Sequence, residues 1–264
     1  MRFESREVVP ESVAAWFQNM PEPVSENLSR YQRKITDYLL EICRLDGLRS
    51  LPGTGSLPWM VMKYYQKAVN LYDEAIYFFL GSLRRSGMSV QCREGCSLCC
   101  YQMPTGLTSM ELVYLYHGMH QTGSPSRLLR RCLEAEEVLC DIYGQIRTGS
   151  FLEPENVDPR TVLLTQYHQK QRPCPFLQED RCLVYPYRPF ACRMHFSLSP
   201  RYLCHPSRLG NSGAIQFNME LGQSVLDALD KLQCRMRLDT SDVLVCGILE
   251  LAVNVLRFEP LTWS

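Results

Sequence analysis

Four cysteines lie within nine residues of the chain, in residues 92–100, which read CREGCSLCC. A second group of four follows in a segment rich in proline and arginine. Thiols at such short spacing can form disulfides or can bind zinc or iron, because a tight turn brings two of them close together. Thiols from the second segment could complete a tetrahedral site begun by thiols of the first, without strain. The sequence therefore predicts a metal site assembled from both groups, with these candidate ligands: Cys92, Cys96, Cys99, Cys100, Cys174, Cys182, Cys192 and, outside the main pattern, Cys204.

The overall charge and the first residues bear on the compartment and on the partners. The 28 basic and 28 acidic side chains cancel, so no global field would attract nucleic acid or an acidic membrane surface. The N-terminus, MRFESREVVPESVAAW, carries charges where a secretory signal has an apolar run. We expect a cytoplasmic protein without nucleic-acid or membrane partners, although a protein partner remains open. Cytoplasmic thiols stay reduced, which favours metal over a disulfide framework.

The five remaining cysteines lie in apolar helical patterns. A free cysteine in such a pattern behaves as a small hydrophobic residue. We expect these thiols to pack in helices and to bind nothing: Cys43, Cys132, Cys140, Cys234 and Cys246.

The cysteine pattern resembles the YkgJ-type cysteine-cluster family, which is described as zinc- or iron-chelating and is named for a CxxCxxCC motif. The resemblance covers residues 92–193 and departs from the motif by a three-residue first gap. Arg188 and Arg193 belong to the matching motif, which implies that they stabilise or hydrogen-bond the ligand thiolates or have a structural role. We expect Arg93 and Arg181 to be solvated loop residues. The matching blocks are C92-x3-C96-x2-C99-C100, C174-P-F-L, C182-L-V-Y185 and R188-P189-x2-C192-R193.

The ligand types alone do not choose the metal, because zinc and iron both accept four thiolates. Adjacent side chains on a helix diverge by about 100°, so Cys99 and Cys100 would not both bind one tetrahedral ion. Either one of them binds, or the thiols form two sites, or they hold a wider 4Fe-4S cluster. His195, three residues after Cys192, is an alternative fourth ligand, and we expect His117 and His120 to be surface histidines.

Two enzymatic alternatives stand beside a structural or accessory metal site. The spacing Cys92-x3-Cys96-x2-Cys99 equals that of radical S-adenosylmethionine enzymes, but the chain lacks their repeating strand and helix pattern. Flagellin lysine-N-methylases carry a related cysteine cluster and use S-adenosylmethionine, so this cofactor enters only under that resemblance. No Ser-His-Asp, paired-carboxylate or phosphate-loop pattern is present. We therefore expect a zinc or iron (iron–sulfur) protein, and redox or methyl-transfer catalysis stays an open alternative.

The elements that must position these residues read as helices. Over residues 59–85, apolar residues recur every three or four positions, as on one face of a helix. Thr108 and Glu111 have the spacing of a helix capping box. Further helices are expected over residues 28–43, from Pro125 to about Gly149, from Asp158, and over residues 214–236 and 241–258. A turn is expected at 51–58, and strand-like alternation is limited to short pieces such as residues 181–185. The predicted class is all-α with irregular cysteine-bearing loops, in one unit: an N-terminal extension (1–58), a cysteine core (59–205) with a helical insertion (105–170), and C-terminal helices (206–264).

Overall fold

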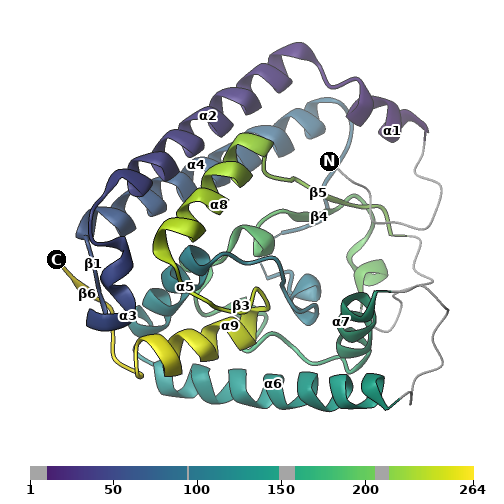
Figure 1. Cartoon of the computed structure of the whole chain (residues 1–264). Helices are drawn as coiled ribbons and strands as arrows, with labels where there is room; N and C mark the ends of the chain where they lie inside the picture. The colour runs from purple at the N-terminus through teal and green to yellow at the C-terminus, as the bar shows by residue number, and fades with distance from the viewer. Residues whose placement is uncertain (1–10, 94, 149–157, 206–213) are drawn as a thin grey trace.

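The computed structural model of this chain describes residues 11–93, 95–148, 158–205 and 214–264. These residues form a mainly helical fold, which confirms the all-α prediction (Figure 1). None of the helices in these four ranges is both long and apolar enough to cross a bilayer.

Nine α-helices and six short strands are present in the described ranges. The helices are α1 (Glu11–Gln18), α2 (Glu22–Arg44), α3 (Leu51–Thr54), α4 (Trp59–Arg85), α5 (Ser109–Gln121), α6 (Pro125–Arg147), α7 (Pro159–Gln169), α8 (Gln223–Met236) and α9 (Leu244–Glu250). The strands pair as β1 (Ser56–Leu57) with β6 (Thr262–Trp263) in parallel, and antiparallel as β2 (Leu177–Gln178) with β3 (Arg181–Cys182) and β4 (His195–Ser197) with β5 (Gln216–Asn218). Single turns of 3₁₀-helix are η1 (Leu48–Ser50), η2 (Leu98–Tyr101), η3 (Tyr185–Tyr187), η4 (Phe190–Cys192) and η5 (Arg201–Cys204), and η7 (Leu251–Val255) is a π-helical turn.

The longest helix, α4, packs against α2. The helix predicted over residues 59–85 is α4, and α2 extends the predicted segment 28–43 by about two turns. Leu39 and Ile42 of α2 are fully buried, as is Val61 of α4, and each such side chain stabilises the fold by about 1.5–3 kcal/mol. Figure 1 shows α2, α4 and α8 along one side of the molecule, and α2 contacts both of the other helices.

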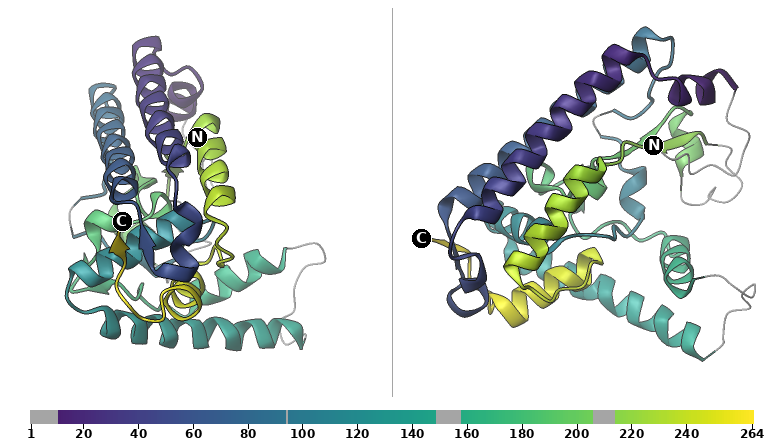
Figure 2. Two further views of the ribbon diagram at one scale, coloured as in Figure 1. Left: turned by 60° about the vertical axis from the view of Figure 1, so that its left-hand side comes forward. Right: turned by 45° about the horizontal axis from the view of Figure 1, so that its top comes forward.

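A second helical layer carries α5, α6, α7 and α9. Figure 2 shows α6 along the base with α9 beside it. The capping box begins α5 as predicted: Thr108 accepts from the Glu111 N–H and Glu111 accepts from the Thr108 N–H at 2.8 Å. The helices α6 and α7 begin at Pro125 and Pro159, where the missing proline N–H costs no helical hydrogen bond.

Three segments differ from the sequence predictions, each for a tertiary reason. Residues 51–58 form a helical turn, α3, and strand β1, which pairs with the C-terminal strand β6. Residues 216–218 are strand β5 rather than helix, because they pair with β4. The last predicted helix is shorter, since α9 begins at Leu244 and passes into η7, and Arg257 and Phe258 beyond it have positive φ values.

The irregular cysteine-bearing segments lie between the two helical layers (Figures 1 and 2). One hydrophobic core runs through the described residues from Val24 to Leu261, and Phe190 and Phe217 insert into it from the irregular part. Phe190 lies edge-on to Tyr72 of α4 with ring centroids 5.2 Å apart. The buried Phe190 ring therefore anchors the irregular segment to α4.

Candidate metal centre

The two cysteine segments are joined directly by backbone. The Cys174 N–H donates to the Cys100 carbonyl at 2.7 Å. Near this contact, the Ser97 hydroxyl donates to the Asp180 carboxylate at 2.5 Å. The loop bearing Asp180 turns between β2 and β3, with Glu179 and Asp180 at positive φ. Residues far apart in the sequence therefore meet at one place.

An inner group of thiols consists of Cys99, Cys174, Cys182 and Cys192. Burial, then the nearby Cys192 and Cys182, hold the pKa of Cys174 well above its usual value. Burial and then Cys182 raise the pKa of Cys192 to about 12, and Cys99 acts on both Cys182 and Cys192. The mutual influence of these four thiols places them in one neighbourhood.

An outer group consists of Cys92, Cys96 and Cys204. The Ser197 N–H donates to the Cys92 sulfur at 3.3 Å, and the Gln91 N–H donates to the Ser197 carbonyl at 2.9 Å. Burial raises the pKa of Cys92 to about 12, and Cys96, Cys99 and Cys204 add to this rise. The turn η5, which ends at Cys204, packs on η2. Cys204, which lies outside the family-like pattern, thus stands beside the first cysteine segment.

Cys99 and Cys100 lie on η2, and their thiols interact with each other. The hydrogen bond to the Cys100 thiol is the largest cause that keeps the pKa of Cys99 well above its usual value, ahead of burial. Cys99 also connects the two groups. Its thiol contributes to the raised pKa of Cys92 in the outer group and of Cys182 and Cys192 in the inner group. It therefore lies between the inner and outer groups.

The thiols of the two groups do not form a coordination site for a metal ion in this structure. Across residues 11–93, 95–148, 158–205 and 214–264, no three side chains of the types Cys, His, Asp or Glu are arranged to hold a metal ion. All eight cysteines of the two groups are free thiols. Their donor chemistry suits zinc or iron, but the structure contains a neighbourhood of thiols rather than a completed site.

Arg193 is a buried cation that organises the loop between η3 and η4. Its side chain is 1% exposed and forms an ion pair with Asp73 of α4 at 2.5 Å. It also donates to the carbonyls of Arg188 and Pro186, each at 2.8 Å. Burial raises the pKa of Cys182, and the guanidinium group of Arg193 offsets part of that rise. One side chain thus anchors this loop to α4 and places positive charge beside a thiol.

Arg188 lies on the other side of the same loop. Its guanidinium carbon is 3.6 Å from the centroid of the Tyr185 ring, and its side chain donates to the Cys192 carbonyl at 3.4 Å. Burial raises the pKa of both Cys182 and Cys192, and the charge of Arg188 offsets part of each rise. Positive charge at this position favours thiolates, which are the forms that bind metal.

Glu111 has a second role beyond its helix cap. Its carboxylate is buried and accepts the Phe190 N–H at 2.9 Å, so it fixes the start of η4 two residues before Cys192. Burial is the largest influence on Glu111 and raises its pKa. The sequence signal of a capping box identified Glu111, but nothing in the sequence indicated its contact with Phe190.

Several sequence predictions for individual residues need correction. His117 and His120 are half-buried rather than surface residues, and burial lowers the pKa of each. Cys140 and Cys234 are on helices but exposed, whereas Cys43 and Cys132 are buried as predicted. Each helix turns its apolar face inward, and these two cysteines lie off that face. His195 is on β4, and its Nδ1 lies 2.9 Å from the Asn218 side-chain oxygen.

Two buried polar atoms next to the thiols have no hydrogen-bond partner in the described part of the chain. They are the hydroxyl oxygen of Tyr167 and Nε2 of His168, both near the end of α7. The Nδ1 atom of His168 lies 3.0 Å from the Tyr101 carbonyl, next to Cys100. The hydroxyl of Tyr65, Nε2 of His120 and Nε of Arg235 are likewise unpaired among the described residues, so unpaired atoms do not single out the thiol centre. The donor chemistry of the thiols themselves is what suits a bound zinc or iron.

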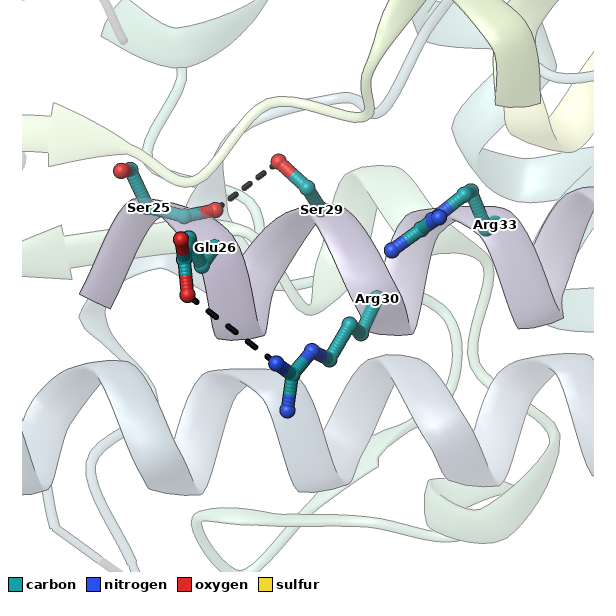
Figure 3. Close-up of a pocket in the computed structure, with 5 residues that line it drawn as sticks. All are labelled: Ser25, Glu26, Ser29, Arg30 and Arg33. Carbon is teal, nitrogen blue, oxygen red and sulfur yellow. Dashed lines mark hydrogen bonds and ion pairs between the residues drawn. The ribbon is translucent and has the colours of Figure 1, made fainter. Parts of the chain in front are cut away.

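Two depressions in the described residues lie away from the thiols. Figure 3 shows one of about 300 Å³ on α2, where the residues that line it are polar and Glu26 faces Arg30. A smaller cavity of about 10 Å³ lies between α2, α4 and the segment after β5. No cysteine or histidine lines either of them, so neither belongs to the thiol centre.

Comparisons with known proteins found no match for this chain among protein-family models, curated proteins or solved structures. The YkgJ-type resemblance therefore stays a prediction from the cysteine and arginine pattern.

Proposed function

We propose that this chain is a metal-binding protein whose cysteine centre holds zinc or an iron–sulfur cluster in a structural or accessory role. One observation carries the proposal: two cysteine segments far apart in the sequence are joined by the hydrogen bond from Cys174 to Cys100, and their thiols share one partly buried neighbourhood with two arginines. The resemblance to the YkgJ-type family points in the same direction.

The proposed roles of the chain's own residues follow from their positions. Cys99, Cys174, Cys182 and Cys192 are the proposed inner ligands, and Cys92, Cys96, Cys100 and Cys204 are the adjacent thiols. Four thiolates around a divalent ion leave about two negative charges, which Arg188 and Arg193 would offset. Metal binding would release protons, because the free thiols have raised pKa values.

A structural role is supported by the character of the segment that carries the second group. Between residues 174 and 204 the regular elements are two to four residues long. Such short elements have no long apolar face of their own, so ligation could supply much of the segment's stability. The enzymatic alternative, redox or S-adenosylmethionine-dependent methyl transfer, rests on resemblance alone.

The test is purification of the full chain without oxygen, followed by metal analysis and a visible spectrum. A brown protein with bound iron and sulfide would identify an iron–sulfur centre, and a colourless protein with bound zinc would identify a zinc site. Replacing both Cys174 and Cys182 by serine should remove the metal. The matched control is Cys234→Ser, at an exposed thiol on α8. The proposal fails if the wild-type chain takes up no metal, or if the double variant retains it.

A further inference from the structure

The two-residue turn between β2 and β3 has an unfavourable sequence for its backbone. Glu179 and Asp180 have φ values of 50° and 59°, and the residues on either side, Gln178 and Arg181, pair with each other. Hairpin turns with positive φ at both positions strongly favour Asn-Gly, because a Cβ is disfavoured in the left-handed region. Strain of this kind persists where the surrounding structure fixes it, so the turn calls for a physical reason.

The side chain of Asp180 reaches the first cysteine segment from this turn. Its carboxylate accepts the Ser97 hydroxyl at 2.5 Å. Ser97 lies between Cys96 and Cys99 in the chain and is 2% exposed, and its carbonyl accepts the Cys100 N–H at 2.9 Å. The first cysteine segment is therefore attached to the hairpin at the residue that links its thiols.

The hairpin that carries Asp180 is anchored independently of the first cysteine segment. Arg131 of α6 donates to the Leu177 carbonyl of β2 at 2.7 Å. Phe176, the residue before β2, is 2% exposed and belongs to the hydrophobic core. The hairpin is thus held by α6 and by the core, and Asp180 offers Ser97 an acceptor in a fixed place.

Two points of attachment together fix how the two cysteine segments are oriented. The bond from the Cys174 N–H to the Cys100 carbonyl is the first, but a single bond leaves the segments free to turn about it. The Ser97 bond to Asp180 is the second and removes that freedom. Ligands must be held within about 0.5 Å of the productive geometry, and ligands ordered before binding lose less entropy when the metal binds.

We propose that the hydrogen bond from Ser97 to Asp180 orients the first cysteine segment against the second for metal binding, and that the unfavourable turn serves to bring the Asp180 carboxylate to Ser97. This inference rests on the proposed metal-binding function. Both are positioning residues, and neither is a ligand. Removing a group that orients metal ligands typically weakens metal binding by about 10–100-fold, so its loss should appear as faster release of the metal.

The test introduces the double change Glu179→Asn, Asp180→Gly into the full chain, which favours the turn while it removes the carboxylate. Two further variants are Asp180→Asn, which keeps an oxygen acceptor, and Ser97→Ala, which leaves unpaired only a carboxylate that is exposed to water. Each protein is purified without oxygen. The readouts are the rate at which its metal is lost to excess chelator, EDTA for zinc or a phenanthroline for iron, and the urea midpoint of the metal-free chain.

The double turn variant and Ser97→Ala should each lose metal about tenfold faster than the wild type. Combining all three changes should be no faster than either, because both remove the same bond. Asp180→Asn should release metal at close to the wild-type rate. The urea midpoint of the metal-free turn variant should not fall, since the Asn-Gly turn offsets the lost bond.

The control is Ser109→Ala, at a serine that is 1% exposed and bonds to Thr240, outside both cysteine segments. It should release metal at the wild-type rate, and release as fast as from Ser97→Ala would overturn the inference, as would a lower urea midpoint in the turn variant. A wild-type rate in the turn variant, or multiplied effects in the combined variant, would also overturn it and leave the proposed function intact. A wild-type chain isolated without metal would overturn the proposed function itself.

Discussion

The backbone N–H of Cys174 donates to the backbone carbonyl of Cys100 at 2.7 Å, and this bond joins the two cysteine segments of the chain. It needs no side chain and no metal, so the thiols are brought into one neighbourhood by the fold itself. A metal ion would then bind to thiols that the fold has already brought close together.

Removing metal should loosen the second cysteine segment before the helices. Residues 173–196 contain only two- and three-residue elements, so ligation would contribute a large share of their stability. Hydrogen exchange with and without chelator should show amide protection falling in this segment, while α2 and α4 stay protected. Equal protection in both states would mean that packing of Phe190 and the Arg193 contacts hold the segment alone.

Cys204→Ser should reduce metal binding even though this residue lies outside the family-like pattern. Its thiol is among the groups that raise the pKa of Cys92, and the turn η5 that carries it packs on η2. We expect a lower metal content per chain or an affinity weakened by about tenfold, measured by metal analysis after dialysis against a chelator. The exposed Cys140 of α6 gives a matched variant, Cys140→Ser, which should retain all of its metal. Identical metal retention by the two variants would remove Cys204 from the centre.

Arg193→Met should destabilise the chain by about 3 kcal/mol, because it leaves two carbonyls and the Asp73 carboxylate without their buried partner. Urea unfolding gives the measurement. Asp73→Asn should cost less, about 1 kcal/mol, since Asp73 is 38% exposed and asparagine keeps an acceptor. A reversed order of the two costs would show that the ion pair, rather than the carbonyl contacts, carries the stability.

Gly118→Ala should be destabilising although alanine favours helix by about 1 kcal/mol. A Cβ at this position of α5 would lie 2.5 Å from the Cβ of Tyr187, which belongs to the loop that carries Cys182 and Cys192. Gly144→Ala in α6 is the matched change, because no atom outside the helix lies within 4 Å of its added Cβ. Thermal unfolding should show a lower midpoint for Gly118→Ala and a raised one for Gly144→Ala. A gain in both variants would mean that η3 moves away without cost.

Stability should fall with acid partly through His117 and His120. Burial is the main cause that lowers the pKa of each below the usual 6.5. The unfolded chain therefore takes up protons first, so stability is fully present above about pH 6.5 and is lost as pH falls through the lower folded pKa values. The double variant His117→Gln, His120→Gln should show a shallower loss of unfolding free energy between pH 7 and pH 5.5 than the wild type. Parallel pH profiles would contradict this assignment.

The sequence determined the features that depend on local chemistry. The apolar periodicity of residues 59–85 defined α4 to the residue, and the capping box of Thr108 and Glu111 defined the start of α5. Both signals arise from neighbours three or four residues apart, which a helix brings together in any context. The short spacing of the cysteines likewise identified the candidate ligands, because thiol chemistry depends on residue type and local separation.

The tertiary structure decided everything that depends on partners distant in the chain. Strand β5 replaced a predicted helix at residues 216–218 because β4 supplied a hydrogen-bonding edge. The same holds for Cys204 beside Cys92, for the Glu111 bond to Phe190, and for the Ser97 bond to Asp180. Such contacts join residues from separate elements, and no local pattern encodes them, since they exist only once the whole chain has packed around its core.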